Sequence, residues 1–205
     1  MRTAPLVRDT DLADAFNIGD TVAPLRGDLL DERTVQIEGT QGYGLGLHHP
    51  NYPQVTSSDC RAIDFMAMAG VSPWDTAVED LQVWLVFRPY PIRVAGNSGP
   101  MLGETTWEQL GLAQERTTVT QKVRRVGHWD PKLARDAVYA NGGPSEHLYL
   151  ALTMADQLDA SVSGVTEQYN LEKSEIVCEF LDMVDADCDQ AVSLVGTSDR
   201  TMVRL

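Results

Sequence analysis

Residues 38–59 hold most of the groups in this chain that could contact a small phosphate-bearing ligand. An apolar run stops at Glu38, a glycine-broken polar loop follows, and the run V-T-S-S-D stands at 55–59. Glycines let a backbone approach a ligand closely, and free amides and hydroxyls at a helix start suit a phosphate. This stretch therefore favours a site for a small anion.

The elements that must position this loop can be predicted from its flanks. The apolar run predicts a strand over 34–38, and the composition turns helical after Asp59. That helix is expected to run to about Ala69, because Gly70 suits a helix end. A strand, a polar loop and a helix start is how α/β proteins build small-ligand sites, at the carboxyl end of a strand.

Two further polar loops follow apolar runs. Thr153–Asp156 leaves a strand expected over 148–153, and Gly196–Asp199 leaves one expected over 191–195. If neighbouring strands are parallel, these loops and the glycine loop converge on one edge of a sheet. Residues 116–125 form the one cationic segment of an acidic chain. Together these features favour a small anionic ligand.

The remaining patterns alternate between helix and strand, which indicates an α/β domain. Further helices are expected at 9–16, 20–30, 105–110, 131–140 and 171–184, and further strands from Leu81 to the break at Pro89 and at 201–205. The predicted fold class is α/β, with a mostly parallel sheet and flanking helices. With 205 residues the chain can form a single domain over 1–205.

Composition excludes several classes of protein. The net charge of −14 and the pI of about 4.5 argue against binding nucleic acid through a basic surface. No run of 18 apolar residues and no apolar signal core occur, so a soluble, cytoplasmic chain without a membrane segment is expected. The three cysteines lie far apart, without zinc or redox spacing, and buried thiols are expected.

The glycine stretch resembles adenylosuccinate synthetase, a purine-biosynthesis ligase family that joins aspartate to IMP using GTP. The family's E-G-A-Q-G loop, its D-H-G-T-Y-P segment and its V-T-S-S-N run are similar, without a gap, to residues 38–42, 48–53 and 55–59. This spacing makes the match specific.

Four more family motifs follow in the same order. The motif A-Y-S-T-R-V-G-A-G-P resembles 88–100, and T-T-G-R-x-R-R-x-G-W-x-D resembles 119–130. T-K-L-D resembles 153–156, and S-T-G-P-D-R resembles 195–200. The resemblance covers nearly the whole chain and concerns the family's C-terminal half. It implies a truncated adenylosuccinate-synthetase-like fold, related to the P-loop NTPases.

The resemblance implies a substrate-binding set of residues. Gln41 resembles the glutamine that contacts the IMP base, and Thr56 the threonine that holds the IMP phosphate. Val94 matches a valine whose backbone touches the ribose, and Arg124 an arginine that reaches ligand phosphate or ribose. Lys122 stands where the family has the arginine that grips the aspartate carboxylate, for which lysine offers only a point charge.

A nucleotide-base-binding set is implied as well. Asp156 resembles the carboxylate that pairs with the guanine N1–H and amino group, which would select GTP over ATP. Gly196 and Thr197 fall at the purine-stacking turn, and Met154 replaces the lysine of T-K-L-D. Taken singly, Gln41 would more often be a loop amide bonded to its own backbone, and Asp156 a solvated helix cap. The shared order of the motifs favours the family roles.

The family's opening G-D-E-G-K-G-K loop has no counterpart, because no lysine follows a glycine in these residues. That loop cradles the γ-phosphate, its aspartate acts as base and helps to hold magnesium, and a downstream histidine acts as acid. No catalytic residue is therefore assigned to this chain, and no cofactor is expected to bind it alone. GTP and Mg²⁺ are expected only with a partner protein that supplies this P-loop half.

Two functions from different classes follow. The first is one subunit of a split or truncated ligase that joins aspartate to IMP, or to a guanine nucleotide, with GTP. It would be an enzyme only with its partner. The alternative is a non-catalytic purine-nucleotide sensor or assembly subunit in a defence or regulatory complex. A decayed fragment without activity is a third possibility. The first two predict a bound purine nucleoside monophosphate and a homo- or hetero-oligomer.

Overall fold

The computed structural model describes residue 10 and residues 19–205. The chain divides into two compact units, one built from the stretches 1–38 and 63–80 and the other from 39–62 and 81–205. The short helix expected over 9–16 lies outside the described residues. The expectation of a single domain stays a prediction.

The smaller unit contains helix α1 (Val22–Leu30) and most of helix α2 (Ala62–Ala69). Both helices were expected, and α2 ends where predicted, because Gly70 takes φ +75° there. A Cβ on Gly70 would lie 2.4 Å from Cγ2 of Val22. Glycine is therefore required both by the backbone and by the contact with α1.

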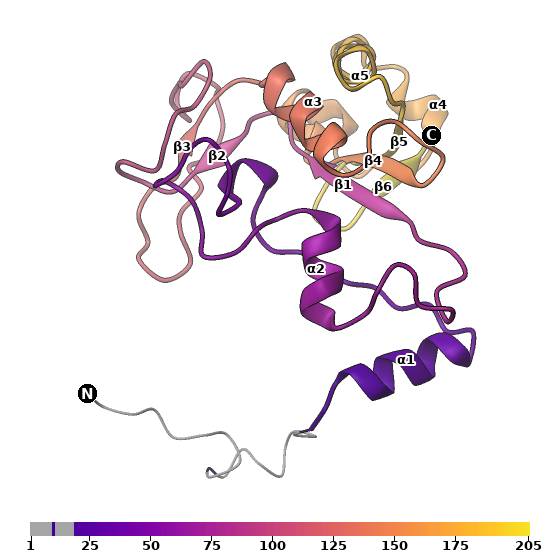
Figure 1. Ribbon diagram of the computed structural model, residues 1–205. Coiled ribbons are helices and arrows are strands. Elements are labelled where there is room, and N and C mark those ends of the chain that lie inside the picture. Colours follow the sequence, from indigo (N-terminus) through magenta and orange to yellow (C-terminus); the bar gives the residue numbers. More distant parts are fainter. Residues whose placement is uncertain (1–9, 11–18) are drawn as a thin grey trace. The chain divides into compact units, whose positions relative to one another are not determined.

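The larger unit is built on a four-stranded sheet in the order β1-β4-β5-β6 (Figure 1). Its strands are β1 (Val83–Phe87), β4 (Leu148–Leu152), β5 (Val192–Gly196) and β6 (Met202–Arg204). Strands β1, β4 and β5 run parallel, and β6 is antiparallel to β5. The predicted class, α/β with a mostly parallel sheet, is confirmed.

One face of this sheet is covered by helices α3 (Pro131–Ala140) and α5 (Glu175–Cys188), which pack against each other (Figure 1). The core between these layers consists of apolar side chains with almost no solvent exposure: Val138, Leu148, Leu150, Leu152, Val177, Val184 and Val195. Burial of this kind stabilises a side chain by about 1.5–3 kcal/mol relative to an exposed one.

Helix α3 begins as its sequence predicts. The carboxylate of Asp130 accepts a hydrogen bond from the amide of Leu133 at 3.0 Å, and Pro131 occupies the first helical position. Asn141 and the glycines after it end the helix.

The smaller elements of this unit lie in the connections. A two-stranded antiparallel ribbon pairs β2 (Ile92–Arg93) with β3 (Arg125–Val126). Short helices are η3 (Tyr43–Leu45), η4 (Ala155–Gln157), η5 (Ala160–Val162) and α4 (Gln168–Leu171). Pro89 and Pro91 separate β1 from β2, as expected of residues that cannot donate to a ladder.

Two element predictions are wrong, and a third element is shifted along the chain. Residues 34–38 form no strand, and they make no backbone hydrogen bond to any described strand. Residues 105–110 form a hydrogen-bonded turn after Thr106, not a helix. The helix expected over 171–184 is present as α5, but it begins at Glu175, because Ser174 caps it, and it continues to Cys188.

Among the residues that the structure describes, no helix is both long and apolar enough to cross a membrane.

Candidate functional site

The carboxyl ends of β1, β4 and β5 meet at one edge of the sheet. The carbonyl oxygen of Phe87 accepts hydrogen bonds from both the amide and the hydroxyl of Thr153, each at 2.9 Å. A Cβ on Gly196 would lie 3.3 Å from Cα of Thr153. The loops after β4 and β5 are therefore adjacent, as predicted. The glycine loop does not join them as a third strand-end loop, because no strand precedes it.

Asp156 lies in the short helix that leaves β4. The turn into it passes through Met154, which takes the left-handed conformation at φ +62°. Asp156 is half-buried, and its carboxylate accepts no hydrogen bond from any residue that the structure describes. A carboxylate without a partner at the carboxyl edge of a parallel sheet can accept hydrogen bonds from a ligand's N–H groups.

The turn after β5 is braced from inside. Thr197 is fully buried, and its hydroxyl donates to the carbonyl of Val165 at 2.6 Å and lies 2.8 Å from the hydroxyl of Thr201. Its amide donates to the carbonyl of Thr201. The Thr197 side chain thus holds the turn, while Gly196 keeps the turn close to Thr153. Contacts of these two residues with a purine stay a prediction.

The cationic segment forms a hairpin-like loop closed by a bridge between Arg116 and Val123. The Lys122 side chain is exposed on this loop. Arg124 is half-buried, its amide donates to the carbonyl of Glu115 at 2.8 Å, and its guanidinium makes no ion pair within the described part of the chain. An arginine in this state can bind a phosphate or a carboxylate.

An arginine that the sequence analysis did not single out joins this loop to the sheet edge. Arg88 follows β1 directly and donates to both carboxylate oxygens of Glu115, at 3.2 and 2.5 Å. It also approaches the side-chain oxygen of Gln157 at 3.5 Å. The loop with Arg124 and the turn with Asp156 therefore share one anchor.

The glycine loop is held by a different arginine. Arg93 is 8% exposed, and it donates to the carbonyls of Ser98 at 2.6 Å and Gly44 at 3.3 Å. Burial and the neighbouring Arg125 lower the pKa of Arg93. Gln41, at the start of this loop, is exposed and takes φ +69°. No contact brings Gln41 to the sheet edge.

Thr56 and Val94 lie in the two segments that Arg93 joins. The amide of Thr56 donates to the carbonyl of Leu45 at 2.8 Å, and the Val94 side chain is 52% exposed. The helix expected after Asp59 begins at Ala62, whose amide donates to the side chain of Asn141, so Thr56 lies ahead of that helix. Between the start of the glycine loop and α2, residues 43–59 form mostly hydrogen-bonded turns.

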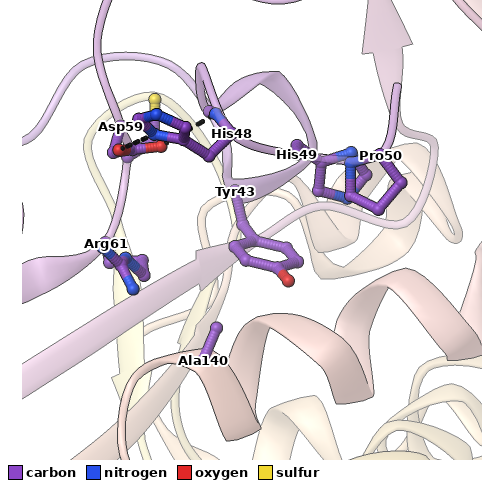
Figure 2. Close-up of a pocket in the computed structure, with 9 residues that line it drawn as sticks. Tyr43, His48, His49, Pro50, Asp59, Arg61 and Ala140 are labelled. Atoms are coloured by element: carbon purple, nitrogen blue, oxygen red, sulfur yellow. Dashed lines mark hydrogen bonds and ion pairs between the residues drawn. The ribbon is translucent and has the colours of Figure 1, made fainter. Parts of the chain in front are cut away.

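A small cavity of about 220 Å³ lies beside the glycine loop (Figure 2). It is lined by Tyr43, Gly46, His48, His49, Pro50, Asp59, Cys60, Arg61 and Ala140. His48 Nδ1 lies 2.7 Å from Asp59, and this hydrogen bond lowers the pKa of Asp59. Burial, and then the charge of Arg93, lower the pKa of His49.

None of the predicted site residues lines this cavity. No group of three or more histidine, cysteine, aspartate or glutamate side chains within the described ranges could hold a metal ion. The cysteines are free thiols, and only Cys188 is fully buried. Burial raises the pKa of Cys188 to about 11, which keeps it protonated and inert.

A family model for adenylosuccinate synthetase matches residues 9–193. The chain belongs to the adenylosuccinate synthetase family. The Pyrococcus horikoshii adenylosuccinate synthetase is 38% identical over 192 residues, which are 92% of this chain and 50% of that enzyme. The Archaeoglobus fulgidus enzyme is 37% identical over 164 residues, 80% of this chain and 45% of that enzyme. The chain thus spans about half the length of the curated relatives it matches.

Solved structures of adenylosuccinate-synthetase type match the fold. The cyanophage S-2L succinoaminodeoxyadenylate synthetase, bound to dGMP and dATP as an energy donor, gives a TM-score of 0.75 at 28% identity. The match covers 97% of this chain and 53% of that one. The Plasmodium falciparum adenylosuccinate synthetase gives a TM-score of 0.70 at 18% identity, over 95% of this chain and 55% of that one, which shows the fold alone.

Three residues that hold these segments together were not singled out from the sequence: Arg88, Arg93 and Glu115. Arg93 matches the arginine of the family's S-T-R-V run, so the motif itself was a usable signal. Arg88 and Glu115 lie 27 residues apart. Their pairing carries no local pattern that a reading of the sequence could detect.

Proposed function

We propose that these residues form the purine-nucleotide-binding part of an adenylosuccinate-synthetase-type ligase, corresponding to the family's C-terminal half. The complete ligase would join aspartate to IMP, or to a guanine nucleotide, using GTP. Membership of the family and the order of seven motif segments along the chain support this proposal.

The observation that supports it most is the arrangement at the sheet edge. The loops after β4 and β5 are neighbours, and Asp156 offers a carboxylate without a partner there. Arg124 adds a guanidinium without an ion pair on a loop fixed to the same edge through Glu115 and Arg88. A carboxylate for base N–H groups and an arginine for phosphate are what a purine nucleotide requires.

The reaction of such a ligase has two steps: phosphorylation of the purine 6-oxygen, and displacement of that phosphate by the aspartate amine. In this proposal Asp156 accepts hydrogen bonds from the base of the energy donor, and Arg124 with Lys122 neutralises anionic groups of the substrates. The described acidic residues do not fit a magnesium site. Protein outside these residues would supply the phosphate loop, the general base, the general acid and the ligands of Mg²⁺.

The acceptor nucleotide is proposed as IMP or a guanine nucleotide. The cyanophage relative is described as bound to dGMP and dATP. Met154 replaces the lysine of the family's T-K-L-D, and Thr197 with Ser198 replaces its Gly-Pro turn. These changes lie on the base-binding side, so the nucleotide preference is best tested with both pairs, IMP with GTP and dGMP with dATP.

The bare side of the sheet supports a protein partner or a further segment. Parallel sheets are normally covered on both faces, yet Val86 is 67% exposed and Trp84, stacked on Tyr149 at 4.8 Å, is 38% exposed. Among the strands that the structure describes, β1 pairs only with β4, which leaves its other edge without a described partner. We propose that the protein carrying the phosphate loop covers this face, on the same or a second polypeptide, or in a homo- or hetero-oligomer.

Calorimetry with IMP, GTP, dGMP and dATP tests the nucleotide site. Binding of IMP or dGMP to the chain alone is expected, and in the complex with the partner Asp156→Asn should weaken the triphosphate at least tenfold, because the amide repels one base N–H group. Asp182→Asn, an exposed change on α5, is the matched control. A folded chain that binds none of the four nucleotides would overturn the proposal.

Co-expression tests the division of labour. The partner is the part of the Pyrococcus horikoshii enzyme that this chain does not match. A stable one-to-one complex that releases GDP from GTP in the presence of IMP and aspartate is expected. A complex that binds nucleotides without turnover would favour the sensor or assembly function instead.

A further inference from the structure

The two halves of the proposed site are carried by segments that are distant in sequence. Asp156 follows β4, while Arg124 and Lys122 lie on the cationic loop. Each segment is held by hydrogen bonds between neighbouring residues. In the turn with Asp156, for example, the amide of Gln157 donates to the carbonyl of Met154. Neither set of local bonds fixes the distance between the segments.

The Arg88–Glu115 pair is the contact that joins them. Arg88 donates to both oxygens of the Glu115 carboxylate and reaches Gln157 beside Asp156. The backbone carbonyl of Glu115 in turn accepts a hydrogen bond from the amide of Arg124. A chain of direct contacts therefore runs from the base-binding turn to the arginine of the cationic loop.

The Arg88–Glu115 ion pair is largely shielded from solvent. The side chains of Arg88 and Glu115 are only 17% and 28% exposed. The Nε atom of Arg88 is buried and has no hydrogen-bond partner. Removing the carboxylate would leave a largely buried guanidinium with less compensation, which is costly in proteins. Lysine at position 88 would keep the charge but lose the two-pronged contact.

A second Arg–Glu pair in the same region provides a comparison. Arg125 donates to both oxygens of Glu104, at 2.7 and 2.6 Å. Its other hydrogen bonds go to Ser98 and Gly99, and it makes no contact with the turn of Asp156. This pair has the same chemistry as Arg88–Glu115 but braces the β2–β3 ribbon only.

We propose that Arg88 and Glu115 are positioning residues that set the spacing between the base-binding turn and the cationic loop, and thereby couple the binding of the two nucleotides. This inference rests on the proposed function. In this proposal neither Arg88 nor Glu115 touches a nucleotide. Filling the base-binding turn orders Gln157, and through Arg88 and Glu115 it orders Arg124 for the second nucleotide, so each nucleotide strengthens binding of the other.

The geometric part is tested without nucleotide, by hydrogen exchange of backbone amides in the free chain. Glu115→Gln and Arg88→Lys should each raise exchange of the Arg124 and Gln157 amides together, about tenfold. The matched control Glu104→Gln should leave the Gln157 amide unchanged. Exchange at Arg124 and Gln157 that stays as in the parent chain would overturn the inference, whether or not any nucleotide binds.

The coupling part is tested by the ratio of monophosphate dissociation constants without and with the triphosphate, for IMP with GTP and for dGMP with dATP. In complex with the partner, the parent chain should give a ratio of about five or more, and Glu115→Gln and Arg88→Lys a ratio near one, with each separate affinity kept within about threefold. A purely structural role would weaken both affinities and keep the ratio, which would overturn the inference. Absence of all nucleotide binding by the parent chain would instead overturn the proposed function.

Discussion

The sheet edge and the glycine loop both contain family motifs, but they are held in place differently. At the edge, the loops with Asp156 and Gly196 leave strands whose side chains, such as Leu150 and Val195, have no solvent exposure. The glycine loop follows no strand, and its long-range support is largely the buried guanidinium of Arg93.

This difference teaches how stability is distributed over the site. Ladder hydrogen bonds and apolar burial make the sheet edge part of the cooperative core. A loop tied down by a few turns and one arginine opens at a lower free energy. The part of the site expected to adapt to a ligand is therefore the loop with Gln41 and Thr56, while Asp156 and Gly196 are expected to stay fixed.

The largest expected effect comes from the core beneath the edge. Leu150→Ala should lower the free energy of unfolding by about 3 kcal/mol, because it leaves a cavity in the middle of β4. Chemical denaturation measures it. The control Leu30→Ala removes a side chain that is 61% exposed and should change stability by less than about 0.5 kcal/mol. A loss below 1 kcal/mol for Leu150→Ala would contradict a core at this edge.

A second experiment separates the two regions. Arg93→Met removes the donor to Gly44 and Ser98 and should loosen the glycine loop by about 1–3 kcal/mol, since the Ser98 carbonyl loses this donor and the Gly44 carbonyl keeps only the side chain of Asn51. Hydrogen exchange at the Thr56 amide should rise, and exchange within β4 should not. Arg200→Met, at an 87% exposed side chain, is the control. Equal loosening of both regions would remove the distinction.

A smaller effect is expected at the start of α3, next to the edge. Asp130→Ala removes the cap on the Leu133 amide and should cost about 1 kcal/mol in thermal or chemical unfolding. Asp199→Ala, at an 85% exposed side chain, is the matched control and should be neutral. An unchanged midpoint for Asp130→Ala would show that the cap contributes nothing.

The smallest effect is a pH dependence confined to the glycine loop. Burial lowers the pKa of His49 from 6.5, so the unfolded chain takes up this proton first as the pH falls. Stability should therefore decrease below about pH 6.5, and the amide of Asn51, which donates to Nδ1 of neutral His49, should lose protection. His49→Gln should remove this step.

The lowered pKa of Asp59 affects stability over a different pH range from that of His49. The hydrogen bond with His48 keeps this carboxylate ionised, so its contribution is present above pH 3.8 and is lost as the pH falls below that value. Asp59→Asn should therefore leave the step of His49 below pH 6.5 unchanged. If Asp59→Asn abolished that step, the loop would not titrate through His49.

Much of the fold could be predicted from the sequence because its signals are local. The cap at Asp130 with Pro131 started α3, Gly70 ended α2, and the apolar runs after Gln82 and His147 formed β1 and β4. Each signal acts within a few residues through hydrogen bonds, fixed dihedral angles or side-chain periodicity.

The predictions that were wrong needed information about distant partners. Residues 34–38 have strand-like residues, but a strand forms only where another strand pairs with it. In the same way, nothing near Thr105 indicated that it would pair with Val126 and leave only a turn behind it.

The sequence by itself determined the family, the alternation of helices and strands, and the residues that end each strand in a polar loop. Only the tertiary structure decided that the turns with Asp156 and Gly196 stand at the ends of adjacent strands, that Gln41 does not follow a strand, and that Arg88 meets Glu115 across 27 residues. The reason is physical: local conformation depends on neighbours in the chain, whereas strand order and buried charge pairs depend on which distant groups can be desolvated together.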